Sequence, residues 1–121
     1  MKKQIIDNPF LDWYTIIYLF WKRKEIDIYV SGKFNEKIET PEDFDWVHYY
    51  QWHTSIVCIF NEEKIDEKGV IHEITHAVQK MLYFLNIPWD YSNTELVANL
   101  MAYYISEWLK FYKIIKENEK I

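Results

Sequence analysis

The chain has little of what builds disulfide-bonded or loop-rich small proteins. Its 121 residues include one cysteine, two glycines and three prolines. A single cysteine excludes an internal disulfide framework, and the apolar neighbours of Cys58 predict a small buried side chain rather than a nucleophile. Few glycines and prolines argue against disorder and against many loops. The fold must therefore rest on an ordinary hydrophobic core, in one domain that covers residues 1–121.

An excess of positive charge is also missing. The sequence has 19 acidic residues against 14 Lys and Arg, which gives a net charge of −5 and no support for binding to nucleic-acid phosphates. Long hydrophobic runs are absent as well. The strongest, residues 10–21, includes Asp12 and Thr15 and is too short and too polar for a transmembrane helix. A core helix is the expected role of this run, and a membrane or partner-docking face is the less favoured alternative.

Hydrophobic residues make up 50% of the chain and aromatic residues 19%, so bulky rings should fill the core. Asn8 and Pro9 predict the start of a helix over residues 10–21. Alternation predicts a half-buried strand over 25–30, and residues 49–60 should supply one or two strands, of which 54–60 is the strongest. Two helices then follow, one over 70–85 and one from Thr94 to about residue 116. We therefore expect an α+β fold with an N-terminal helix, a short and mostly antiparallel sheet, and two C-terminal helices.

The most informative feature is an H-E-x-x-H motif at residues 72–76. On a helix, His72 and His76 lie one turn apart on one face, where two imidazoles can bind one cation. Zn²⁺ accepts neutral imidazoles, and an open position lets it activate water, for which Glu73 would be the general base. The motif thus predicts a zinc-dependent hydrolase that cleaves peptide bonds. The alternative is a solvated helix face, although uncharged Ala77 gives Glu73 no ion-pair partner there.

The third ligand must come from outside the motif. Gln79 and Leu82 exclude the metzincin pattern, which has Gly and His at these positions, and no histidine follows His76. Glu95, near the start of the last predicted helix, is the candidate, with Asp90 as the fallback. A competing role for Glu95 is a capping box with Ser92, which needs no metal.

Two segments together resemble a known family. H-E-I-T-H at 72–76 and T-E-L-V-A-N-L-M-A at 94–102 resemble the gluzincin pattern of thermolysin-like metallopeptidases. The short chain is similar to the minimal minigluzincins and to small H-E-x-x-H proteins encoded by tailed bacteriophages. The resemblance covers roughly residues 50–108, and it implies that His72, His76 and Glu95 bind zinc and that Glu73 is the general base.

The resemblance carries further expectations. Asn99 lies one turn after Glu95, where gluzincins often have an Asp, and it could hydrogen-bond a ligating imidazole. Larger members steady the oxyanion with a downstream His or Tyr, and here four tyrosines are available: Tyr83, Tyr91, Tyr103 and Tyr104. Related folds bind an extended peptide along an edge strand, for which residues 51–60 are the candidate, and His53 could approach the site.

A different class of function also fits the sequence. The chain could keep a zincin-like fold and bind zinc with little or no catalysis, as a component of a phage particle or as an inhibitor of a host factor. The expected partners are therefore a peptide or protein substrate or a protein assembly such as a phage particle. The N-terminus shows no secretion signal, because Gln4, Asp7 and Asn8 interrupt it, so we expect a cytoplasmic or virion-associated protein.

Overall fold

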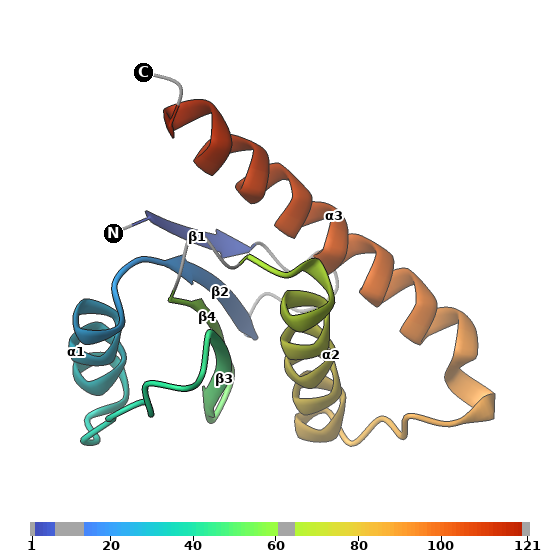
Figure 1. The fold of residues 1–121 in the computed structure, drawn as a ribbon. Helices are drawn as coiled ribbons and strands as arrows, with labels where there is room; N and C mark the ends of the chain where they lie inside the picture. The colour runs from blue at the N-terminus through green and yellow to red at the C-terminus, as the bar shows by residue number, and fades with distance from the viewer. Residues whose placement is uncertain (1, 7–13, 61–64, 120–121) are drawn as a thin grey trace.

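The structure, a computed structural model, describes residues 2–6, 14–60 and 65–119. In chain order its elements are β1 (Lys2–Ile6), β2 (Thr15–Phe20), α1 (Arg23–Phe34), β3 (Trp46–Gln51), β4 (Thr54–Ile59), α2 (Glu67–Phe84), the short 3₁₀ helix η2 (Tyr91–Asn93) and α3 (Thr94–Glu119) (Figure 1). The α+β class is confirmed. The order, however, begins with two strands and not with a helix.

The four strands form one mixed sheet in the order β1-β2-β4-β3. β1 pairs with β2 and β3 pairs with β4 in antiparallel fashion, whereas β2 and β4 are parallel. The predicted sheet was mostly antiparallel, which agrees with two of these three pairings. Because β2 and β4 are central, almost every side chain on them is buried.

Helices cover both faces of the sheet. In Figure 1, α1 lies on one side of the sheet and α2 and α3 lie on the other. The alternation along β2 explains this arrangement, since Ile16 and Tyr18 pack with α2 and α3 while Ile17 and Leu19 pack with α1. The sheet is therefore the middle of three layers.

The N-terminal helix predicted over residues 10–21 is wrong in the described part. Residues 15–20 form β2, while Asn8, Pro9 and the rest of 10–13 lie outside the described residues. The six residues of β2 are β-branched, aromatic or Leu, and nearly all are buried, as in a central strand. A short, continuous apolar run fits a buried helix and a central strand equally well, so periodicity could not separate them.

The strand predicted over residues 25–30 is also wrong, because these residues belong to α1. The side chains that α1 buries are Ile26, Val30 and Phe34, which are four residues apart as in a helix. Ile28, which produced the apparent alternation, is 65% exposed. One exposed isoleucine therefore imitated the period of a strand.

Downstream, the predictions agree better with the structure. The strands expected within 49–60 correspond to β3 and β4, and the two C-terminal helices are α2 and α3. The choice of residues 51–60 as the sheet edge is wrong, since β4 has a partner on each side. The edge on this side of the sheet is β3.

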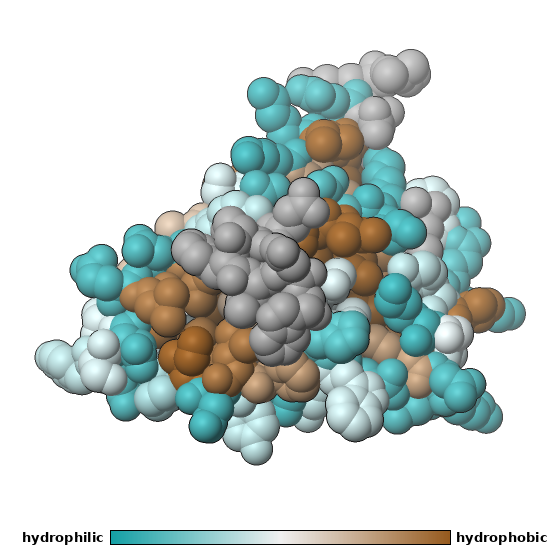
Figure 2. All heavy atoms as spheres, turned by 180° about the vertical axis from the view of Figure 1, so that it is seen from behind, coloured by the Kyte–Doolittle hydropathy of each residue, from teal (hydrophilic) through white to brown (hydrophobic). Residues whose placement is uncertain are grey.

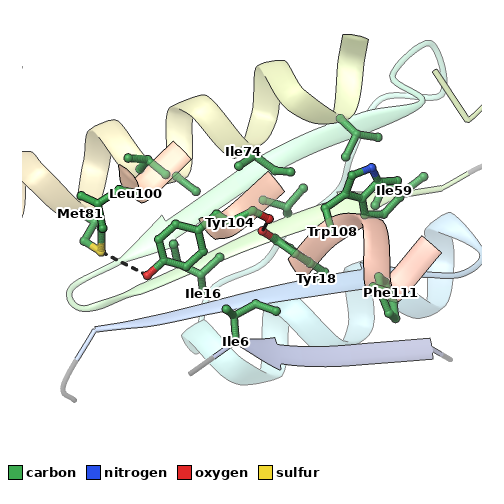
Figure 3. Packing of buried hydrophobic residues seen from close by; sticks show 14 of the residues in the cluster. Ile6, Ile16, Tyr18, Ile59, Ile74, Met81, Leu100, Tyr104, Trp108 and Phe111 are labelled. Carbon is green, nitrogen blue, oxygen red and sulfur yellow. Dashed lines mark hydrogen bonds between the residues drawn. The ribbon is translucent and has the colours of Figure 1, made fainter. Parts of the chain in front are cut away.

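The core between the sheet, α2 and α3 contains buried tyrosines with defined partners. The Tyr18 hydroxyl donates a hydrogen bond to the Tyr104 carbonyl at 2.7 Å, and the Tyr104 hydroxyl donates to Met81 Sδ at 3.7 Å (Figure 3). Burial raises the pKa of both phenols, so they stay protonated inside the core. Trp108 fills the next turn of α3 and is almost fully buried. These contacts fix the position of α3 along α2.

The surface offers no membrane-spanning element among the described residues. No helix in that part of the chain is long and apolar enough to cross a bilayer. On the face seen from behind, hydrophobic patches are bordered by hydrophilic residues (Figure 2).

Candidate metal centre

The two histidines of the motif are brought together by α2. Asp66 caps the helix by accepting a hydrogen bond from the Lys68 backbone N–H, and the apolar face of α2 is buried in the core. On the opposite face, His72 and His76 are exposed, and their Nε2 atoms are 3.0 Å apart. Two imidazoles that each bind zinc at roughly 2.0–2.1 Å have nitrogens about 3.0–3.4 Å apart. The spacing is therefore that of two ligands of one cation, or of one imidazole hydrogen bond.

Glu73 lies one residue after the first histidine and is half-buried. Burial raises the pKa of its carboxyl, and the neighbouring His76 and His72 oppose that rise. The charged carboxylate is less stable in this position than in water, so it accepts a proton more readily.

The edge strand β3 lies against α2 because of one glycine. A Cβ on Gly69 would meet the Trp46 ring at 2.1 Å, so the indole lies directly on the helix backbone. Side chains two residues apart on a strand share a face, so His48 and Tyr50 also face α2. The His48 ring stacks on Tyr50 at 5.6 Å and on His76 at 6.4 Å between centroids.

His48 is held as a neutral imidazole. Burial, followed by the charges of His76 and Lys80, lowers the pKa of His48 to about 4. Its Nε2 atom is buried and has no hydrogen-bond partner among the described residues. Buried polar atoms are usually paired, so the Nε2 atom of His48 is an exception among the described residues.

A cavity of about 600 Å³ opens between α2, β3 and the connection to α3. Its polar wall contains His48, Glu73, His76 and Lys80, and its apolar wall includes residues 87–89. The volume is that of a site for a small molecule or a few peptide residues. Two of the four predicted site residues, Glu73 and His76, therefore line one cavity.

Glu95 is not brought to the histidine pair. It is exposed in the first turn of α3. Tyr104, nine residues later, contacts α2 at Met81, and Glu95 lies about 14 Å from Tyr104 along the α3 axis. No group of three His, Cys, Asp or Glu side chains that could hold a metal exists in the described part of the chain. The three-ligand set stays a prediction, and the structure assembles two of its members.

The other candidates have separate positions. The Asp90 carboxylate accepts a hydrogen bond from the Ser92 backbone N–H at 2.9 Å and caps η2. Ser92 lies within η2, and α3 begins two residues later at Thr94. Asn99 is exposed on α3, and His53 is exposed in the turn between β3 and β4 and does not line the cavity.

Of the four tyrosines considered for the oxyanion, one lines the cavity. Tyr83 contributes to its wall. Tyr104 is buried in the core, and Tyr91 is 99% exposed and lines another surface depression. Tyr103 packs beside Tyr104 on α3. Tyr83 is therefore the member of this set that is near the motif.

His48, Tyr50 and Lys80 were not predicted from the sequence. The signal for the first two was the alternation along residues 46–50, which puts every second side chain on one face. The signal for Lys80 was its place one turn after His76, on the side of α2 that also carries Glu73. Neither pattern resembles a motif, so only the packing of β3 on α2 identifies these residues.

Comparisons with protein-family models, with curated proteins and with solved structures give no match for this chain.

Proposed function

We propose that this protein is a zinc-dependent peptidase in which His72 and His76 hold the ion and Glu73 is the general base. The observation that carries the proposal is the 3.0 Å separation of the two Nε2 atoms beside a cavity that Glu73 and His76 line. The two imidazoles are ligands that suit zinc. Glu95 remains the proposed third ligand, and α3 would have to move for its carboxylate to reach the same ion.

The chain's own residues suggest how the reaction would proceed. Zinc, when bound in such a site, lowers the pKa of water and polarises a carbonyl. Glu73 accepts a proton from the attacking water and delivers it to the leaving nitrogen, which needs a carboxylate free of the metal. The half-buried position of Glu73 supports this role. His48 is buried next to His76 and is neutral, so its ring adds no positive charge beside the zinc ion that His76 would hold.

Metal binding is tested by replacing one ligand. The purified protein should bind close to one equivalent of zinc and melt at a higher temperature with zinc than with a chelator, because binding stabilises the folded state. His76→Ala should lose both effects. The matched control is His53→Ala, which removes an exposed histidine outside the cavity and should leave both unchanged. Equal zinc content in the two variants would mean that the pair is only an imidazole hydrogen bond.

Catalysis is tested at Glu73. Glu73→Gln should keep zinc and lose turnover of a peptide library by at least about 100-fold, since a general base contributes this much. Hydrolysis by the native protein must also stop on addition of a chelator. Unchanged turnover in the Gln variant would remove Glu73 from the mechanism.

A second function is favoured by one observation. Because the described residues contain no group of three His, Cys, Asp or Glu side chains that could hold a metal, the chain could bind zinc as a non-catalytic component of an assembly such as a phage particle. This alternative gives stoichiometric zinc and no hydrolysis of any library peptide, whereas a peptidase gives both.

A further inference from the structure

The position of Lys80 in the cavity indicates what kind of peptide would bind there. Lys80 is on α2, one turn after His76 and two turns after Glu73, and all three line the same cavity. Its Nζ atom lies 3.8 Å from the centroid of the Tyr50 ring and 5.0 Å from that of Tyr83. Two aromatic rings, one from β3 and one from α2, thus hold the ammonium group in place.

This ammonium group has no acidic partner among the described residues. Neither of the ion pairs found there involves Lys80, and of the cavity-lining residues only Glu73 is acidic. Lys80 is instead close enough to His48 to lower the pKa of that imidazole. A partly buried ammonium group that lies over two aromatic rings and forms no ion pair among the described residues can accept the carboxylate of a ligand.

The cavity also has an apolar wall. Ile87, Pro88 and Trp89, which lie in the connection between α2 and η2, form this wall together with Leu82. A ligand that fits both walls carries a bulky apolar group and a negative charge close to each other. The C-terminal residue of a peptide has both, when its side chain is large and apolar.

The spacing along α2 connects this feature to the proposed reaction. Four residues separate His76 from Lys80, which is about 6 Å along the helix axis. An extended peptide covers this distance with one or two residues, at roughly 3.3–3.6 Å each. A carboxylate at Lys80 is therefore one or two residues beyond a peptide bond at the histidine pair.

We propose that Lys80 binds the carboxylate of a peptide ligand, so that this protein takes peptides by their C-terminal end and removes one or two residues. Only the removal of residues rests on the proposed peptidase function, whereas the binding of a carboxylate by Lys80 does not. The carboxylate could also come from an Asp or Glu side chain inside a peptide, and the experiment separates these two sources.

The test is a binding measurement that needs no turnover. Chelator-treated protein is titrated calorimetrically with acetyl-Ala-Ala-Phe as the free acid, with the same peptide as its C-terminal amide, and with acetyl-Ala-Glu-Phe amide. The free acid should bind at least about tenfold more tightly than the amide, as expected for a charge-assisted hydrogen bond. Lys80→Met should abolish this preference. Lys68→Met, on an exposed residue in the first turn of the same helix, should keep it.

The outcomes separate the two proposals. Equal binding of acid and amide by the native protein overturns the role of Lys80, whether or not the zinc-loaded protein hydrolyses peptides. Tight binding of the internal Glu peptide, with weak binding of the free acid, overturns the C-terminal assignment. A preference for the free acid that depends on Lys80 supports the carboxylate site even if hydrolysis is absent, in which case only the peptidase proposal fails. If hydrolysis occurs, amidation of the C-terminus should reduce kcat/KM in native protein and not in Lys80→Met.

Discussion

The two sides of α2 differ in what holds them in place. The side towards the sheet and α3 is apolar and fully buried, with Ile74, Val78 and Met81 surrounded by other side chains. The side towards β3 carries Glu73 and His76 beside an open cavity, and β3 contacts it through Trp46 at Gly69, His48 at His76 and Tyr50 at Lys80. Substitutions in the core on the first side should therefore lower stability most, whereas substitutions of Glu73 or His76 on the second side should mainly affect the proposed metal binding and hydrolysis.

The largest loss of stability should follow from a cavity on the core side. Trp108→Ala removes an almost fully buried indole from the interface of α3 with Tyr18. We expect the free energy of unfolding to fall by about 3–5 kcal/mol, measured by chemical denaturation. The control, Trp89→Ala, removes an indole that is 42% exposed in the loop before η2 and should cost clearly less. Similar losses in both variants would contradict the proposed difference between the two sides.

The next largest effect should come from the contact between β3 and α2. Gly69→Ala puts a methyl group into the Trp46 ring, and relief of this overlap must shift the indole or the helix against β3. Overpacking of this kind costs about 1–3 kcal/mol.

Gly32→Ala is the matched control for that variant. Gly32 is also in a helix, α1, and a Cβ there meets no other atom within 4 Å. It should stabilise the protein by roughly 0.5–1 kcal/mol, since Ala is the better helix former. Two glycine substitutions in helices should thus change the melting temperature in opposite directions, and a shift of the same sign in both would show that Trp46 does not lie on the helix as described.

The smallest effect should appear only at alkaline pH. Burial raises the pKa of Tyr104 above its ordinary value of 10, so the folded state favours the neutral phenol. The stability from this group is complete below pH 10 and is lost as the pH rises from there through the folded-state pKa. Tyr104→Phe should therefore make the free energy of unfolding fall less steeply above pH 10. Tyr91→Phe, at a residue that is 99% exposed, should leave the slope unchanged, and an unchanged slope in both variants would contradict the buried state of Tyr104.

The sequence predicted mainly those features that depend on residues close to one another along the chain. Helix spacing alone puts His72 next to His76, and the structure confirms that these residues share a helix. The position of Glu95 depends instead on how α3 packs along α2. That packing is fixed by large side chains such as Tyr104 and Trp108, whose partners are far away in the sequence, and no motif carries this information.

The N-terminal half was the harder part for a similar reason. A run of buried residues shows no period when both faces of a strand are covered, so β2 resembled a helix. His48 escaped attention because its neighbours in space, His76 and Lys80, are about 30 residues away along the chain. The close approach of β3 to α2 depends on Gly69, and nothing in the sequence around this glycine indicates that a strand packs on it.

The parallel pairing at the centre of the sheet has a consequence for how the chain reaches its folded state. β2 and β4 align Thr15 with Thr54, so this pairing closes a long loop that contains α1 and β3. The β3–β4 hairpin and the α2–α3 pair, in contrast, join segments that are adjacent in the sequence. Contacts between distant segments carry a larger loop-closure cost and form slowly. We expect refolding to start in the C-terminal half, with the first two strands added last.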